Sequence, residues 1–508
     1  MPDRLTSLDL TFLKAESPAT PMHVGTVDIF EPPVHGDDGF DYESLVALIR
    51  DRIAFVPRYR QRIQQIPGRF AGPIWVDDED FDITFHVRRS ALPRPGTHAQ
   101  LLELVARIMS RRLDRARPLW EMYLVEGLQG DRFAIIAKSH QALVDGNSTV
   151  DIGQVVLDST AHPRDTPTDT WQPAHPPSAL ELLAGVFADA TRHPTAVLEL
   201  ARAEMASLTG STSVREVLGD VVGSVVAQRH VQESSLHVKT SGQRRFTTVQ
   251  TDLEDYRAVR AMHGGTVNDV ILAVVAGALR AWMMTRGESV SPTRGVRAVV
   301  PVSIRDDDEE EPTSLGSRVI SSTVNLPVGE NSPVMRLHQI SYQTKVHKDT
   351  GRAVSARSLV GIAGFAPTTL HALAARVATA TVRPIDDVVI TNVPGPQFPL
   401  YAQGAPMLAS YPVVPLMPGQ GLSVGVTSYD GKVSFGLNAD RTAMPDLAVF
   451  AQCVTDALDE LLDTTKGSRS RASRGRKTGL GRGKPDKAEA VGRGKSAAPS
   501  RGPKKAGS

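Results

Sequence analysis

One short stretch of the sequence combines residue types that could do acid–base chemistry. Residues 138–148 read KSHQALVDGNS, and they place His140 before Gln141, with Asp145 and Gly146 shortly after. An imidazole can take up and release a proton near neutral pH, whereas a carboxamide can only donate and accept hydrogen bonds. The stretch predicts either an acid–base site or a site whose base has been replaced.

The segments around this stretch alternate between strands and helices. Runs of strand length, either apolar or alternating, occupy residues 22–30, 119–128, 132–140 and 297–304. Helical periodicity is clearest over residues 44–56, 101–113 and 268–284. Because strands and helices are interleaved in both halves, the sequence predicts the α/β class, with His140 at the end of a buried strand.

The remaining segments indicate two domains and a connector. Residues 158–179 are rich in Pro, Thr and Asp, which predicts an irregular crossing, and the stretch that follows to about residue 235 is mostly helical but weakly patterned. Asp430 and Gly431 separate two alternating runs, as in a β-hairpin, and a final helix ends near residue 462. We predict an N-terminal domain, a connector, a C-terminal domain and a basic tail, over residues 1–160, 161–240, 241–465 and 466–508 respectively.

The charge of the chain is unevenly spread. The 508 residues hold 57 Lys and Arg against 56 Asp and Glu, yet residues 466–508 alone hold 14 basic residues against Asp486 and Glu489. This tail has almost no large apolar side chain, which predicts disorder, and its charge suits an anionic membrane or a lipid droplet. Nucleic acid would suit the same charge but is not the partner we expect, and a solubilising extension is an equally good interpretation.

Cysteine content and hydropathy predict a cytoplasmic protein. Cys453 is the only cysteine, so an intrachain disulfide or a cysteine zinc cluster is excluded. Acidic residues interrupt the first 16 residues, where a signal peptide would need an apolar run. The most apolar run, VILAVVAGAL at 270–279, is shorter than the roughly 20 residues that span a bilayer. We therefore expect any membrane contact to be peripheral.

Six short motifs, taken in their order along the chain, resemble one enzyme family. They are PMHVG at 21–25, VPRYRQR at 56–62, LDRARPLWE at 113–121, TVNDVILAVVAGALR at 266–280, TNVPGP at 391–396 and LAVFAQCVTDALDELL at 447–462. The chain resembles the bacterial wax ester synthase/acyl-CoA:diacylglycerol acyltransferase family from Leu8 to about Leu462. The resemblance implies two chloramphenicol-acetyltransferase-like domains joined by a helical connector, with an active-site tunnel at their interface.

The resemblance also implies a reaction. Family members transfer an acyl group directly from acyl-CoA to diacylglycerol or to a long-chain alcohol, which yields triacylglycerol or a wax ester. No covalent acyl-enzyme, metal or cofactor is expected, with acyl-CoA as the co-substrate.

The family's signature, His-His-x-x-x-Asp-Gly, matches this chain except at one position. The second histidine of the signature is the general base, and Gln141 stands in its place, while His140, Asp145 and Gly146 match. A base that takes the proton of the attacking alcohol contributes about 10² to 10⁴-fold to the rate, which a carboxamide cannot do. Gln141 therefore predicts a weakened enzyme or a protein that binds without turnover.

His140 could replace the missing base only in a particular geometry. Neighbours on a strand point to opposite faces, so His140 and Gln141 cannot exchange roles unless the strand has ended by residue 140. In the family, the first histidine supports the site and the aspartate pairs with an arginine. The resemblance thus implies supporting roles for His140 and Asp145, and Gly146 supplies backbone freedom at the turn.

Two further motifs have both a packing and a functional interpretation. Pro118, Leu119 and Trp120 match a Pro-Leu-Trp segment of the family and could bind substrate, but core packing is the simpler interpretation. Asn268 and Asp269 begin a long apolar helix, where they could act as caps. The resemblance implies that this pair lies near the domain interface and supports the active site.

Other classes of site are not indicated. The histidines, among them His23, His338 and His347, form no metal-ligand spacing with carboxylates, and a core position is the simpler interpretation of His23. Gly264 and Gly265 precede a helix but lack the Gly-x-x-x-x-Gly-Lys pattern of a phosphate-binding loop. The sequence predicts neither a metal site nor nucleotide hydrolysis.

The sequence leaves three functions open. The first is acyl-CoA-dependent transfer to a lipid alcohol, slowed by Gln141 but helped by the positioning of the two substrates. The second is a non-catalytic relative that binds acyl-CoA or neutral lipid, and the third is a scaffold that holds a lipid or nucleic-acid surface through its tail. We favour the transferase because the resemblance covers all but the tail, although function inferred from fold alone is an analogy.

Overall fold

The computed structural model describes most of both predicted domains. The described residues are 3–33, 40–66, 72–143, 152–163, 169–178, 181–182, 235–304, 318–349 and 386–466. Asp145, Gly146, most of the connector at 161–240 and the tail after Lys466 lie outside them. The roles expected of these segments therefore stay predictions.

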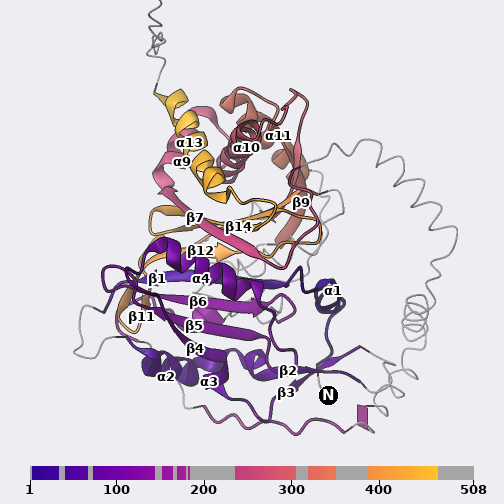
Figure 1. The fold of residues 1–508 in the computed structure, drawn as a ribbon, viewed down its shortest axis with the longest axis vertical. Helices are drawn as coiled ribbons and strands as arrows, with labels where there is room; N and C mark the ends of the chain where they lie inside the picture. The colour runs from indigo at the N-terminus through magenta and orange to yellow at the C-terminus, as the bar shows by residue number, and fades with distance from the viewer. Residues whose placement is uncertain are drawn as a thin grey trace, which may run out of the picture. The chain divides into compact units, whose positions relative to one another are not determined.

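A six-stranded sheet carries the stretch that contains His140. The order of its described strands is β11-β12-β1-β6-β5-β4 (Figure 1), in which β4 and β5 are parallel and the other pairs are antiparallel. The strands are β1 (His23–Phe30), β4 (Val87–Ala91), β5 (Trp120–Glu126), β6 (Phe133–His140), β11 (Tyr401–Ala402) and β12 (Ala405–Val413). Every residue of β6 is buried, and its two neighbours, β1 and β5, fix the position of its last residue, His140.

The two strands β11 and β12 reach this sheet from late in the chain. β12 pairs with β1 in antiparallel register, with Gly25 opposite Val413. The predicted C-terminal domain at 241–465 thus contributes residues 401–413 to the sheet of the N-terminal half. Because β12 covers β1, an edge of hydrogen-bonding groups that would otherwise be open is paired.

Helices cover both faces of the first sheet. One apolar cluster joins α4 (His98–Ser110) to Val27 and Ile136, and another joins α2 (Tyr42–Arg52) to Phe30. α4 begins with a capping box between Thr97 and Gln100, which satisfies backbone N–H groups of its first turn. Because side chains alternate along a strand, the side chains of Lys138 and His140 share the face of Ile136, which is the face that α4 covers.

The second sheet has the order β7-β14-β13-β10-β8-β9. Its strands are β7 (Arg244–Asp252), β8 (Val296–Ile304), β9 (Arg318–Leu326), β10 (Val388–Pro394), β13 (Leu422–Tyr429) and β14 (Lys432–Asp440). Four helices gather on one side of it: α9 (Leu253–His263), α10 (Val267–Thr285), α11 (Pro333–Asp349) and α13 (Leu447–Thr465) (Figure 1). Shorter elements complete the described fold: α1 (Ser7–Ala15), η1 (Ile53–Phe55), η2 (Pro57–Arg60), β2 (Gln61–Gln64), β3 (Ile74–Asp77), α3 (Ile83–His86) and α5 (Ile152–Val155).

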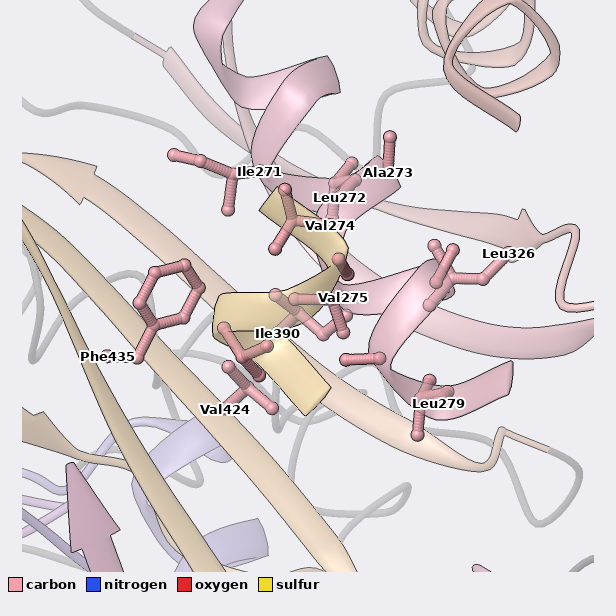
Figure 2. Close-up of a cluster of buried hydrophobic side chains, with 14 of the residues drawn as sticks. Ile271, Leu272, Ala273, Val274, Val275, Leu279, Leu326, Ile390, Val424 and Phe435 are labelled. Carbon is pink, nitrogen blue, oxygen red and sulfur yellow. The ribbon is translucent and has the colours of Figure 1, made fainter. Parts of the chain in front are cut away.

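The core of the second half is built around α10. Figure 2 shows Val275 of this helix in one buried cluster with Ile390, Val424 and Phe435 of neighbouring strands. By length and composition, the 19 residues of α10 are apolar enough to cross a membrane. However, 72% of the 18-residue apolar segment of this helix is buried inside the protein. The sequence predicted this helix over residues 268–284, which α10 confirms, although its continuous apolar run was counted over 270–279 alone and the helix is also buried at Trp282 and Met283.

Most elements predicted from periodicity are confirmed. The strand predictions at 22–30, 132–140 and 297–304 correspond to β1, β6 and β8, and Asp430 and Gly431 form the turn of the β13–β14 hairpin. The interleaved strands and helices confirm the α/β class. The prediction that Asn268 and Asp269 cap α10 was wrong in one detail, because the N-cap residue of this helix is Thr266. Its hydroxyl accepts from the backbone N–H of Asp269, whose carboxylate accepts from the backbone N–H of Thr266.

Candidate active site

The candidate site is a turn at the end of β6. The strand ends at His140, and residues 141–143 form the turn. The backbone N–H of His140 donates to Leu119 O at 2.9 Å, and the backbone N–H of Gln141 donates to Met22 O at 2.9 Å. The turn is therefore held from both sides, by the residue before β5 and by the residue before β1.

The imidazole of His140 is directed to two partners inside the protein. Its Nδ1 accepts a hydrogen bond from the backbone N–H of Ala142 at 3.0 Å, and its Nε2 lies 3.8 Å from Oε1 of Glu16. A neutral ring whose Nδ1 is an acceptor carries its proton on Nε2, so we assign that tautomer. In this state His140 supports the turn and has no lone pair left to take a proton from an alcohol.

Glu16 is the centre of a buried charged cluster. This residue follows α1, and its side chain is 1% exposed. Its carboxylate lies 3.4 Å from His23 Nε2 and accepts a hydrogen bond from Arg115 Nε at 3.0 Å. Burial alone would raise the pKa of Glu16, but the close contact with His23, the electrostatic effect of His140 and the hydrogen bond from Arg115 outweigh burial and lower it to about 2. The carboxylate is therefore ionised at neutral pH.

His23 completes the cluster from the neighbouring strand. It lies directly opposite His140 in the β1–β6 ladder, and the two rings meet edge to face with centroids 5.9 Å apart. Burial lowers the pKa of His23 to about 4, although its contact with Glu16 opposes the shift. The ring is therefore neutral at pH 7, in agreement with the expectation of a core histidine.

The burial of His23 should make the protein less stable in acid. An unfolded histidine titrates near 6.5, so between 6.5 and about 4 the unfolded chain binds more protons at this residue, and stability falls as the pH falls. We expect the melting temperature to drop between about pH 7 and about pH 4.5, less steeply in His23→Asn than in the natural chain. The exposed residue His162 provides the control, since His162→Asn should keep the natural slope. Identical slopes in all three proteins would contradict this assignment.

Gln141 carries the one side-chain amide among the described residues of the turn. It is fully buried, and neither Oε1 nor Nε2 of its amide has a hydrogen-bond partner among the described residues. A buried polar atom without a partner costs about 1–3 kcal/mol, so a polar group that reached this amide would be bound favourably. The amide can donate and accept hydrogen bonds, but it has no basic lone pair near neutral pH.

Lys138 has a structural role that the sequence did not reveal. Its ammonium group donates to the carbonyl oxygens of Ile108 at 3.0 Å and Arg111 at 2.6 Å, at the end of α4, and lies 3.5 Å from Glu121. Burial lowers the pKa of Lys138 to about 8, although Glu121 opposes the shift. A cation at a helix C-terminus is favourable, so Lys138 fixes α4 against β6.

The Pro118, Leu119 and Trp120 segment supports the turn from within the core. Trp120 is fully buried, its indole N–H donates to Tyr59 O at 2.7 Å, and its ring stacks on His86 at 4.6 Å. Leu119 is also fully buried and supplies the carbonyl that holds His140. These contacts fit the packing interpretation of the segment, and a direct contact with substrate stays a prediction.

Asn268 and Asp269 are held by residues of the second half. Asn392 Nδ2 donates to Asn268 Oδ1 at 2.9 Å, which ties the start of α10 to the TNVPGP motif of β10. The hydroxyl of Thr344 on α11 donates to Asp269 Oδ1 at 2.8 Å. The hydrogen bonds of Asn268 and Asp269 therefore anchor the start of α10. A role of the two residues in supporting the reaction stays a prediction.

The sequence did not identify Glu16 as a site residue. Glu16 approaches His140 only because β1 and β6 pair, and this pairing cannot be read from the spacing of the two residues. The sequence feature that could have identified Glu16 is the presence of a carboxylate shortly before the PMHVG motif. Asp145 and Gly146 lie outside the described residues, and no group of three or more metal-binding side chains occurs within them.

Comparison with known proteins places this chain in a family. The family model described as the wax ester synthase/diacylglycerol acyltransferase catalytic domain matches residues 5–271, and the one described as the WS/DGAT C-terminal domain matches residues 315–462. A Mycobacterium tuberculosis (strain CDC 1551 / Oshkosh) protein that carries the name diacylglycerol O-acyltransferase is 33% identical over 468 residues, which are 90% of this chain and 99% of the relative.

Solved structures agree with this result. The wax ester synthase/diacylglycerol acyltransferase from Marinobacter aquaeolei VT8 is 28% identical, with a TM-score of 0.63 over 91% of this chain and 100% of that chain. The first condensation domain of the CDA synthetase, at 14% identity and a TM-score of 0.50 over 91% of this chain and 97% of that chain, shares the fold alone. From these matches, the chain belongs to the wax ester synthase/diacylglycerol acyltransferase family.

Proposed function

We propose that this chain is an acyl-CoA-dependent O-acyltransferase that esterifies diacylglycerol or a long-chain alcohol. The observation that carries the proposal is the buried amide of Gln141, which has no partner among the described residues and stands where the family places its base. A relative aligned over 90% of the chain carries the name diacylglycerol O-acyltransferase, which supports the same reaction.

Gln141 acts in this proposal by position and not as a base. Its Oε1 accepts a hydrogen bond from the acceptor hydroxyl, which aims the hydroxyl oxygen at the carbonyl carbon of the thioester. The new C–O bond forms, the C–S bond breaks, and the hydroxyl proton leaves with CoA as its free thiol. Holding two reactants in the reactive geometry can supply about 7–11 kcal/mol of the barrier, so slow turnover does not require a base.

A second candidate function is binding without turnover. It is favoured by the same residue, because a carboxamide cannot take the proton of the acceptor. In that case the protein would hold acyl-CoA or a neutral lipid, and Gln141 would be a neutral hydrogen-bond partner.

Single-turnover transfer of labelled palmitoyl-CoA to diacylglycerol and to hexadecanol separates the two functions. Ester product from the natural chain, above the rate without protein, supports the transferase. Saturable binding of palmitoyl-CoA with no ester formed would identify a binding protein and overturn the proposal.

The role of His140 can be tested with two substitutions. We expect His140→Asn to lower the transfer rate less than about tenfold, because the asparagine Oδ1 can take the place of Nδ1 as acceptor for Ala142 N–H. His140→Leu leaves this N–H without a partner, at a cost of about 1–3 kcal/mol, and should lower both the melting temperature and the rate. If both variants lost transfer completely at an unchanged melting temperature, His140 would be the base and not a support.

A further inference from the structure

The two oxygens of the Glu16 carboxylate face different groups. Oε2 accepts hydrogen bonds from Nε and a terminal nitrogen of Arg115 and lies 3.8 Å from Nε of Arg112. Oε1 lies 3.4 Å from Nε2 of His23 and 3.8 Å from Nε2 of His140. Because the two arginines hold Oε2, it is Oε1 that is turned toward the imidazole rings.

The backbone that carries Glu16 is also held in place. Glu16 is the C-cap residue of α1, and the residues after it close a tight turn. In this turn Ser17 N–H donates to Thr20 O at 3.2 Å, and Thr20 N–H donates to Ser17 O at 3.1 Å. The guanidinium of Arg115 also donates to Leu13 O at 2.8 Å, on the other side of Glu16. The carboxylate is therefore fixed at one place in the core.

A fixed negative charge at this place favours one tautomer of His140. Glu16 Oε1 and His140 Nε2 are too far apart for a direct hydrogen bond, but both side chains are only 1% exposed, so water screens little of the field between them. An N–H group directed at the carboxylate is favoured over a lone pair directed at it. The positive charge of Lys138, on the same face of β6, is offset by Glu121 at 3.5 Å. The proton therefore stays on Nε2, and Nδ1 is the acceptor for Ala142 N–H.

We propose that Glu16 is a positioning residue for the reaction and that it acts through His140 on Gln141. The inference rests on the proposed function, since it explains how the amide that aims the acceptor hydroxyl is itself aimed. With its proton on Nε2, His140 accepts from Ala142 N–H, and this bond closes the turn directly after Gln141. With its proton on Nδ1, the ring would direct one N–H at another, and the turn would lose this bond. In this role Glu16 does not contact the reacting atoms.

Glu16→Gln keeps the shape of this side chain and removes its charge. Its amide oxygen should turn to the arginines, which only donate, so that the amide NH2 group faces His140 and moves the histidine proton to Nδ1. We expect kcat for transfer to hexadecanol to fall about tenfold or more, while KM for palmitoyl-CoA changes less than about twofold. Asp158→Asn is the matched control, because Asp158 forms a buried ion pair with Arg52 at 2.8 Å. This variant should lower the melting temperature without changing kcat.

The 15N NMR spectrum of histidine-labelled protein reports the tautomer of His140 without any turnover. The signals of this ring are identified by their loss in His140→Asn. We expect the proton on Nε2 in the natural chain and in Asp158→Asn, and on Nδ1 in Glu16→Gln. A natural chain whose His140 ring carries the proton on Nδ1 would contradict the inference, even if Glu16→Gln did not fold.

A double substitution tests whether Glu16 acts through His140. An asparagine at residue 140 has no tautomer to select, so Glu16→Gln should lower kcat much less in the His140→Asn background than in the natural chain. Equal decreases in the two backgrounds, or a Glu16→Gln protein with the natural kcat, would overturn the inference and leave the proposed function intact. If the natural chain forms no ester but the tautomer still changes in Glu16→Gln and not in Asp158→Asn, the positioning role stands and the proposed reaction fails.

Discussion

Gln141→His is expected to transfer palmitate to hexadecanol about 10² to 10⁴ times faster than the natural chain, which is the usual contribution of a general base. Three structural facts support this result. Residue 141 is fully buried, its backbone is fixed by Met22 O, and the amide at its end has no partner among the described residues. Histidine is close in size to glutamine, so its ring can enter the same space with a nitrogen near the position of the amide.

The pH dependence of this variant distinguishes a base from a simple change in packing. A histidine base gives a single-turnover rate that rises with pH and levels off above the pKa of the imidazole, ordinarily near 6.5. The natural chain has no group at residue 141 that titrates in this range, so its rate should lack that step. Gln141→Met fills a similar volume without polar atoms and is the control for packing. A Gln141→His protein that folds normally but is no faster than the natural chain would show that residue 141 does not face the reacting hydroxyl.

Gly25→Ala is expected to destabilise the protein by about 3 kcal/mol or more, at the upper end of overpacking effects. A Cβ atom on Gly25 would lie 2.2 Å from Ala137 O, and the clashing atom belongs to the backbone of β6 and cannot rotate away. Gly25 pairs with Lys138 on β6 and Val413 on β12, so a shift here separates the strands that bring His23 opposite His140. Activity should be lost along with stability.

Gly72→Ala is the matched control for this substitution. A Cβ atom on Gly72 would lie 3.5 Å from Leu10 Cδ1, which is an ordinary contact. Both variants reduce the freedom of the unfolded chain in the same way, so the difference between their melting temperatures isolates the clash. A Gly25→Ala protein that melts within a degree or two of Gly72→Ala would contradict the strand register described above.

The parts of the fold that were predicted correctly are those whose signal is local. β6 begins with an apolar run at 133–137, α10 shows helical periodicity, and the Asp430 and Gly431 turn has the residue types that a hairpin needs. Each pattern is produced by a few neighbouring residues and by the solvent, so the sequence alone is sufficient to reveal it.

The parts that were not predicted depend on contacts between distant segments. The approach of Glu16 to His140 and the place of β12 beside β1 are both set by contacts of this kind. Local preference contains no information about either pairing, because many registers would satisfy the same alternating pattern. The resemblance supplied the position of Gln141 in the site, but only the structure shows that its amide is buried and that His140 is directed away from a role as base.

The pairing of β12 with β1 also bears on how the protein is made. Residues 23–30 leave the ribosome early, whereas their partner at 405–413 is among the last segments of the folded body to be synthesised. During most of translation the nascent N-terminal half would therefore hold β1 as an exposed edge, which is a site for mispairing with other chains. We expect a fragment that ends before residue 401 to aggregate or to require a chaperone, even though it contains the entire turn of Gln141.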